Sequence, residues 1–157
     1  MSTIDAKLAE LGITLPSPAS PVANYVPVVR SGNLVVISGQ ICFGADGKLA
    51  AEHKGRVGAE VAPEIAIEAA RLAAINVIAQ LKAAIGDLDK AVRCVRLGGF
   101  ISSTPEFTGQ AGVMNGASDL MVAVFGDKGR HARSTIGVTA LPMGAAVEVE
   151  AMFEVEG

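Results

Sequence analysis

Residues 61–85 carry the strongest secondary-structure signal in the sequence, and they predict one long helix. Pro63 stands in the first turn, Glu64 and Glu68 follow near the N-terminus, and Gly86 comes directly after the last turn. Many alanines lie in this segment, and such small side chains let a helix lie close to a sheet. Larger apolar side chains recur at helical spacing and form a stripe: Ile65, Leu72, Ile75, Ile78 and Leu81.

Short β-rich runs flank this helix on both sides. Before it, residues 26–30 and 34–38 are separated by Ser31-Gly32-Asn33, whose turn chemistry predicts a hairpin. After it, residues 91–102 are strand-like, and a weaker helix is expected over residues 108–125.

Two strands are predicted at the C-terminal end, over residues 133–140 and 146–156, with Leu141-Pro142-Met143-Gly144 as the turn between them. The last strand alternates, with Val147, Val149, Ala151, Phe153 and Val155 on one face and Glu148, Glu150, Met152, Glu154 and Glu156 on the other. The resulting order β-β-α-β-α-β-β predicts an α+β fold with two helices on one face of the sheet.

The chain of 157 residues has the length of one domain, and we expect residues 1–157 to form it. Residues 1–22 are expected to form a short helix and a proline-rich arm. Half of the residues are apolar, which predicts a homo-oligomer, because large exposed apolar patches tend to mark interfaces. The charged N-terminus lacks an apolar signal core, and no apolar run is long enough to span a membrane, so we expect a cytoplasmic protein.

The charged and metal-binding residue types exclude several classes of function. The net charge of −3 argues against general nucleic-acid or anionic-membrane binding. Cys42 and Cys94 are far apart and are expected to be small buried side chains. With His53 and His131 as the only histidines, no cluster has zinc-site spacing, and no metal is predicted.

Arg133 is the best candidate for chemistry, because it begins a strand whose same face carries Thr135, Gly137 and Thr139. These small neighbours leave room for a ligand to reach the guanidinium, which pairs bidentately with a carboxylate. The alternative is a salt bridge at the surface or at an interface, and the spacing alone favours that alternative.

Glu148 is a candidate general base, but its spacing alone favours a solvated strand face, because Glu150, Glu154 and Glu156 follow with the same period. His131 could transfer protons, but a lone loop histidine is more often merely exposed. Other polar residues with possible roles are Tyr25, Ser38, Gly39 and Asn115, each with a plain structural alternative.

Several segments, taken together, indicate a protein family more specifically than any one of them does. They are Val36-Ile37-Ser38-Gly39-Gln40-Ile41, the helix ending Ala83-Ala84-Ile85-Gly86, Leu88-Asp89-Lys90-Ala91-Val92, Phe107 with Val113-Met114-Asn115, Ala132-Arg133-Ser134, Leu141-Pro142 and Val147-Glu148-Val149-Glu150-Ala151. Over roughly residues 20–155 the chain resembles the Rid/YjgF family, which is also known as endoribonuclease L-PSP. The specific part is the C-terminal run that starts at Ala132.

The resemblance implies a chorismate-mutase-like α+β fold, a homotrimer and a ligand site in each subunit cleft. It also implies hydrolysis of reactive 2-imino acids and their enamine tautomers to 2-keto acids and ammonia, without a cofactor. By matching position, Arg133 would hold the substrate carboxylate, Glu148 would orient and deprotonate water, and Thr135 would contribute main-chain contacts. The pocket would be lined by Tyr25, Ser38, Gly39 and Asn115.

The chain departs from the family pattern in two motifs and in its N-terminal arm, which is longer than in the short deaminases of the family. Ala23-Asn24-Tyr25 stands where Gly-Pro-Tyr is usual, and His131 stands where a proline usually precedes Ala-Arg-Ser. The His-Ala-Arg-Ser motif looks like a divergent branch of the family.

A plain hairpin between the last two strands would place Arg133 opposite about Phe153 and Glu148 opposite about Val138. About 17 Å would then separate Arg133 from Glu148 along the strands. We therefore expect either a bulge that shifts the register or a site that two subunits share.

Two other functions compete with the hydrolase. One is a non-catalytic trimer that binds a small carboxylate metabolite. The other is an RNA-cleaving enzyme, for which the local basic residues are Arg93, Arg96, Lys128, Arg130 and Arg133. The acidic net charge and the scarcity of stacking aromatic side chains count against the second.

Overall fold

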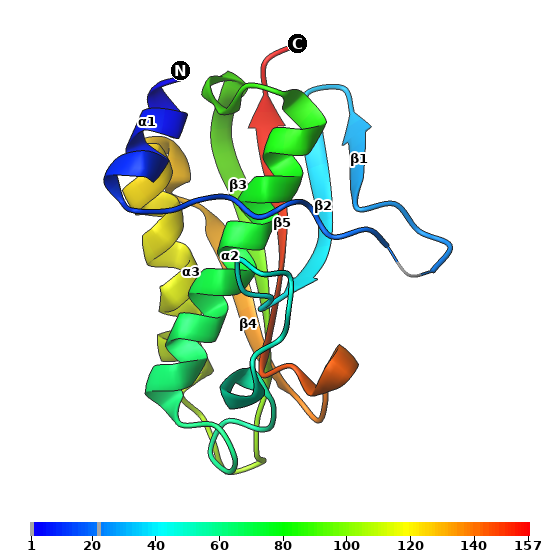
Figure 1. Ribbon diagram of the computed structural model, residues 1–157, viewed down its shortest axis with the longest axis vertical. Helices are drawn as coiled ribbons and strands as arrows, with labels where there is room; N and C mark the ends of the chain where they lie inside the picture. Colours follow the sequence, from blue (N-terminus) through cyan, green and yellow to red (C-terminus); the bar gives the residue numbers. More distant parts are fainter. Residues whose placement is uncertain (1, 22) are drawn as a thin grey trace.

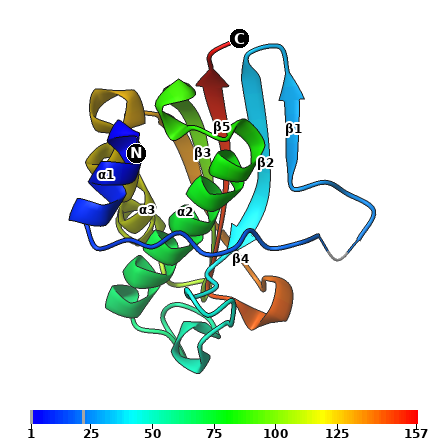
Figure 2. The same cartoon turned by 45° about the horizontal axis from the view of Figure 1, so that its top comes forward.

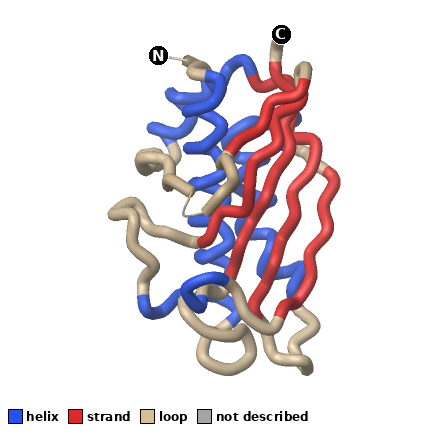
Figure 3. Tube along the Cα trace, turned by 90° about the vertical axis from the view of Figure 1, so that its right-hand side faces the viewer, coloured by secondary structure: helices blue, strands red, loops and turns tan. Residues whose placement is uncertain are grey.

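The computed structural model describes residues 2–21 and 23–157 and has two layers (Figure 1). One layer is a five-stranded sheet, and the other consists of helices on one face of it (Figure 3). The helices are α1 (Thr3–Glu10), α2 (Pro63–Ile85) and α3 (Gln110–Phe125), and the strands are β1 (Val28–Ser31), β2 (Leu34–Ile41), β3 (Ala91–Ser102), β4 (Ala132–Val138) and β5 (Val147–Val155). The predicted α+β class and element order are therefore confirmed.

The order of strands in the sheet is β1-β2-β5-β3-β4. The β1–β2 hairpin forms as expected, whereas β4 and β5 do not pair with each other as they would in a plain hairpin. β4 pairs in parallel with β3, and β5 lies between β2 and β3, antiparallel to both. The connection Pro142–Gly144 is a 3-10 turn in which Met143 has a φ of 59°. It carries the chain away from β4 instead of folding it back alongside.

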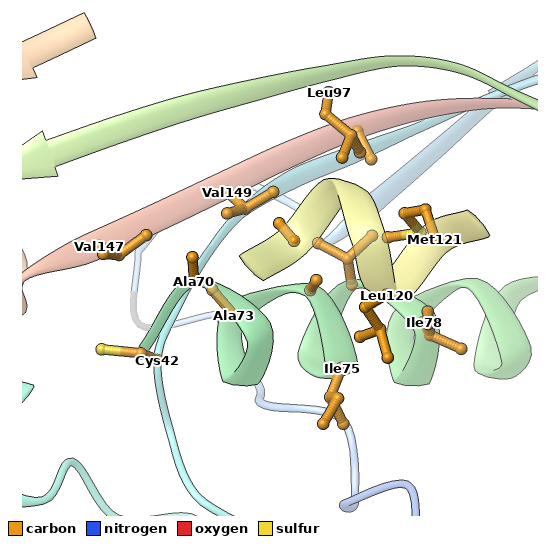
Figure 4. Packing of buried hydrophobic residues seen from close by; sticks show 14 of the residues in the cluster. Cys42, Ala70, Ala73, Ile75, Ile78, Leu97, Leu120, Met121, Val147 and Val149 are labelled. Atoms are coloured by element: carbon orange, nitrogen blue, oxygen red, sulfur yellow. The ribbon is translucent and has the colours of Figure 1, made fainter. Parts of the chain in front are cut away.

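The buried face of α2 consists mainly of alanines, not of the whole predicted isoleucine–leucine stripe. Ile78 and Leu81 are buried, whereas Ile65 is 37% exposed. The fully buried alanines are Ala66, Ala69, Ala70, Ala73 and Ala74. Figure 4 shows Ala70 and Ala73 on the side of α2 that faces Val149 of β5. Small side chains allow this close approach of helix and sheet.

The same closeness holds between α2 and α3. A Cβ atom at Gly116 of α3 would run into the backbone carbonyl oxygen of Ile67 in α2. Glycine is therefore required there for packing, because the backbones of the two helices lie too close for any side chain.

Several polar contacts attach the N-terminal segment to the rest of the protein, among them the ion pair between Asp5 of α1 and Lys82 of α2 at 2.6 Å. The backbone N–H groups of Thr3 and Ile4 donate to the carboxylate of Asp89 at 2.8 and 2.9 Å, which caps α1. The arm that follows crosses α2 on its way to β1 (Figure 2). Gln80 of α2 donates to the carbonyl oxygen of Ala19 at 2.9 Å and holds the arm in place.

In the part of the chain that the structure describes, no helix covers the other face of the sheet (Figure 3). Exposed apolar side chains on this open face include Val29, Val95 and Ile136. Within residues 2–21 and 23–157, no helix is both long and apolar enough to cross a bilayer.

Candidate functional site

The residues suggested by the sequence fall into two groups. The arginine group lies between β4 and α3, on the helical side of the sheet. Arg133 donates from Nη1 to the hydroxyl of Ser118 at 3.0 Å and from Nη2 to the carbonyl oxygen of Ala111 at 3.1 Å. Asn115 lies on the same face of α3, because residues three and four apart on a helix are neighbours. Asn115 is exposed, and Arg133 is partly buried.

His131 belongs to the arginine group through Ser118. Its Nε2 lies 2.9 Å from Ser118 Oγ, and its Nδ1 lies 2.6 Å from the carbonyl oxygen of Gly129. The histidine is therefore not the merely exposed loop residue that its sequence position favours. It connects the turn before β4 to the face of α3 that holds Arg133.

Thr135 follows on the same side of β4. Its Oγ1 is buried and has no hydrogen-bond partner among the residues that the structure describes. A buried hydroxyl without a partner is uncommon and calls for an explanation, such as a bound molecule or a further chain.

The glutamate group lies at the C-terminal end of β2, beyond the residues of that strand that pair with β1. Glu148 of β5 is next to Gly39 of β2, and a Cβ atom at Gly39 would run into the Glu148 carboxylate. Tyr25, which is 48% exposed, lines the same cavity of about 360 Å³. Other residues that line it are Ser17, Gln40, Phe43, Asn76, Pro142 and Met143.

Ser38 stabilises the wall of this cavity without lining it. Its hydroxyl donates to the carbonyl oxygen of Val26 at 2.9 Å, and the register of β2 against β5 shifts between Ile37 and Gln40. The bulge and this hydrogen bond set the end of the arm, including Tyr25, beside Gly39.

The environment of Glu148 changes its acidity. Burial raises the pKa of Glu148 above the ordinary value, and the nearby carboxylate of Glu150 raises it further. A glutamate with a raised pKa is suited to exchange protons with a ligand or with water, because proton transfer is most effective when the pKa is close to the working pH.

The two groups lie on opposite faces of the sheet. Arg133 is aligned with Leu97 of β3, whereas Glu148 is aligned with Phe100, three residues further along that strand. The two residues are thus about 10 Å apart along the strands and about 10 Å apart across them. The distance of about 17 Å assumed a plain hairpin between β4 and β5, so it does not apply to this sheet.

The sequence did not reveal Ser118, although this residue joins Arg133 to His131. Its spacing of three residues from Asn115 places both on one face of α3, and this spacing is the one sequence signal that could have pointed to Ser118.

Gln40 and Asn76 were also not singled out as parts of a cavity. Both are amides that are more than nine-tenths buried. Among the described residues, no group of three or more His, Cys, Asp or Glu is arranged to hold a metal ion.

Comparisons with known proteins agree with this architecture. A family model described as "YjgF/chorismate mutase-like, putative endoribonuclease" matches residues 5–155. Protein TCP17 of Trypanosoma cruzi is 46% identical over 152 residues, which cover 96% of this chain and 93% of that protein.

Solved structures extend the comparison. The protein Atu1372 from Agrobacterium tumefaciens is 47% identical, with a TM-score of 0.90 and coverage of 98% of this chain and 92% of that one. TdcF of E. coli, solved with bound serine, is 23% identical with a TM-score of 0.64, covering 92% of this chain and 96% of that one. At that identity, TdcF is evidence for the fold alone.

Proposed function

Because the chain belongs to the YjgF/chorismate mutase-like family, we propose that it hydrolyses 2-imino acids and their enamine tautomers to 2-keto acids and ammonia. The reaction takes place in a homotrimer, at a site that two adjacent subunits share. The observation that carries the proposal is that Arg133 lies in the arginine group and Glu148 in the glutamate group, on opposite faces of one sheet.

Arg133 binds the carboxylate of the substrate. A guanidinium has five N–H donors, and Ser118 and Ala111 accept from only two of its nitrogens. The remaining donors can form a bidentate pair with a carboxylate, which gives both affinity and orientation. Thr135 lies on the same side of β4, two residues from Arg133, and its main chain can contribute contacts to the ligand.

Glu148 exchanges protons with water. It takes a proton from the water as the water oxygen bonds to the imine carbon, the electron pair of the C=N bond moves to nitrogen, and the nitrogen receives that proton from Glu148. From the resulting aminol Glu148 takes the hydroxyl proton as the C=O bond forms. The C–N bond then breaks with its electron pair on nitrogen, which receives this second proton and leaves as ammonia. The raised pKa of Glu148 supports both transfers.

The open face of the sheet supports the proposal of a shared site. Exposed Val29, Val95 and Ile136 make this face suited to contact with another copy of the chain. A neighbouring subunit can bring its Arg133 towards Glu148, which the fold of one subunit cannot do. Oligomerisation therefore has a catalytic purpose in this proposal.

A coupled assay tests the hydrolase. An amino-acid oxidase generates a panel of imino acids, and the rate at which each imine disappears is measured with and without the protein. We expect acceleration by the wild type and by Gly112→Ala, and loss of acceleration in Arg133→Ala and Glu148→Gln. Turnover by Arg133→Ala equal to that of the wild type would rule out the proposed role of the arginine.

A non-catalytic binder of small carboxylates is the second candidate. The donors of Arg133 that Ser118 and Ala111 leave free favour it, because they can bind a carboxylate without any chemical step. This function predicts that pyruvate binds to the wild type, and not to Arg133→Ala, while no imine is turned over.

Endoribonuclease activity, which the family description names, has less support in this chain. Arg96 pairs with Glu150 at 3.6 Å and Arg130 with Asp127 at 3.3 Å, so acidic partners partly neutralise the local basic residues. RNA affinity that weakens steeply with salt would support this activity instead.

A further inference from the structure

We infer that Ser118 and His131 are positioning residues that hold the guanidinium of Arg133 ready for the ligand carboxylate. This inference rests on the proposed role of Arg133 as the carboxylate-binding residue. It starts from three hydrogen bonds in series, which run from the carbonyl oxygen of Gly129 through His131 and Ser118 to Arg133.

For a neutral imidazole ring, the partners fix the direction of every hydrogen bond in this series. The carbonyl oxygen of Gly129 can only accept, so Nδ1 of His131 carries a proton. In the neutral ring Nε2 is then an acceptor, and the hydroxyl of Ser118 must donate to it. The oxygen of Ser118 keeps its lone pairs for Nη1 of Arg133, which can only donate.

The series matters because arginine is long and has many rotamers. The carbonyl oxygen of Ala111 holds Nη2, and Ser118 holds Nη1, so two hydrogen bonds fix the plane of the guanidinium. A fixed plane determines the direction from which a carboxylate can form a bidentate pair. Ser118 is itself fixed by His131, whose ring is held by the backbone of Gly129 in the turn before β4.

The position of His131 explains why a proline would not serve here. Proline has no side-chain nitrogen and could not accept from Ser118. The hydroxyl of Ser118 would then be free to rotate, and its hydrogen bond to Arg133 would be less well defined. In this chain the histidine and the serine therefore act together as one support for the arginine.

Removal of the hydroxyl tests the inference. The probe is pyruvate, and its binding is measured by titration calorimetry. We expect Ser118→Ala to weaken pyruvate binding about tenfold, which is the loss expected for one hydrogen bond to a charged group. Ser118→Thr keeps the hydroxyl and is expected to restore most of the affinity. Gly112→Ala, on the same helix, is the matched control and should bind like the wild type.

Coupling between the two residues separates positioning from a general loss of structure. We expect His131→Ala to weaken binding by a similar factor. The variant with both substitutions should bind pyruvate no more weakly than either single variant, because both changes break the same series of hydrogen bonds. If the two losses of affinity multiply in the double variant, the inference is contradicted. In the imine assay the loss should fall on KM more than on kcat, since the carboxylate is bound before and during the reaction.

A ligand-free measurement distinguishes this inference from the proposed function. The guanidinium N–H signals of Arg133 can be assigned by NMR through their absence in Arg133→Lys. In the free protein we expect these signals to exchange faster with water in Ser118→Ala than in the wild type or Gly112→Ala. Unchanged signals together with unchanged pyruvate affinity would overturn the inference. Faster exchange in a protein that turns over no imine would uphold it and reject the hydrolase.

Discussion

Arg133 and Glu148 lie on opposite faces of one sheet, with β3 between their strands. No rotamer change can bring an arginine and a glutamate together through a packed sheet. If the two act on one ligand, each must come from a different copy of the chain. The arrangement therefore makes a prediction about mixtures of variants that single substitutions cannot make.

Mixing two inactive variants should restore activity. Arg133→Ala keeps an intact Glu148, and Glu148→Gln keeps an intact Arg133. After the two are unfolded together in equal amounts and refolded, roughly a quarter of the sites should receive both intact residues, because each site takes one from each neighbour in a closed ring. Imine turnover near a quarter of the wild-type rate is expected. Turnover no higher than that of either variant alone would mean that the residues do not share a site.

We predict that Gly39 is essential for activity, because the Glu148 carboxylate lies directly against it. A Cβ atom there would run into the Glu148 carboxylate, so Gly39→Ala must displace that side chain. We expect a loss of at least tenfold in kcat/KM, the effect of misplacing a group that must be held within about 1 Å. Circular dichroism should show an intact fold. Wild-type kcat/KM in a folded Gly39→Ala protein would argue against catalysis by Glu148.

The raised pKa of Glu148 has a consequence for stability. The folded protein holds this proton more tightly than the unfolded chain, so stability decreases as the pH rises from about 4.3, the ordinary glutamate pKa, through the folded value. Glu148→Gln removes this loss. The difference in unfolding free energy between Glu148→Gln and wild type should therefore be more favourable at pH 7 than at pH 4. Urea unfolding of both proteins across this range measures it, and a constant difference would contradict the assignment.

Two glycines of α3 should respond in opposite ways to alanine. Gly116→Ala would push a Cβ atom into the backbone of Ile67, and we expect it to cost about 1–3 kcal/mol. Gly112 has nothing within 4 Å of its would-be Cβ atom, so Gly112→Ala should stabilise the helix by roughly 0.5–1 kcal/mol. Urea unfolding of both variants tests the pair. A Gly116→Ala protein as stable as Gly112→Ala would contradict the close packing of α2 and α3.

The cap of α1 should depend on pH. Hydrogen bonds from the backbone N–H groups of Ile4 and Thr3 lower the pKa of Asp89 below its ordinary value. The cap is thus present above about pH 3.9, the unfolded value, and is lost as the pH falls through the lower folded value. At neutral pH, Asp89→Ala should let trypsin cleave after Lys7 earlier than in the wild type. Asp127→Ala, at a side chain that is 99% exposed, is the control and should be cleaved at the wild-type rate.

The local structure of this chain could be predicted from its sequence, and the pairing of its strands could not. The helix over 61–85 and the strand over 91–102 form as expected, because proline, glycine and apolar spacing act over short distances. The partner of β4 is chosen by distant contacts. The helix between β3 and β4 provides the long crossover that a parallel pair needs, whereas the short segment after β4 resembles a hairpin turn.

The same limit applies to the candidate site. Arg133 and Glu148 were identified by resemblance, and their surroundings explain why they could act. Ser118 was missed because its contact with Arg133 exists only once β4 lies beside α3. The alanine face of α2 was underestimated because a pattern of large apolar residues says little about how closely two backbones approach.

The central position of β5 makes the order of assembly unusual. β5 comes after every other strand along the chain, yet it pairs with both β2 and β3. While a ribosome is still making the residues before Val147, only the β1–β2 hairpin and the parallel β3–β4 pair can form, and the inner edges of β2 and β3 remain open. Open edges of this kind attract other chains. The stage of synthesis before β5 emerges should therefore be the step at which aggregation competes most strongly with folding, and at which a chaperone would have the greatest effect.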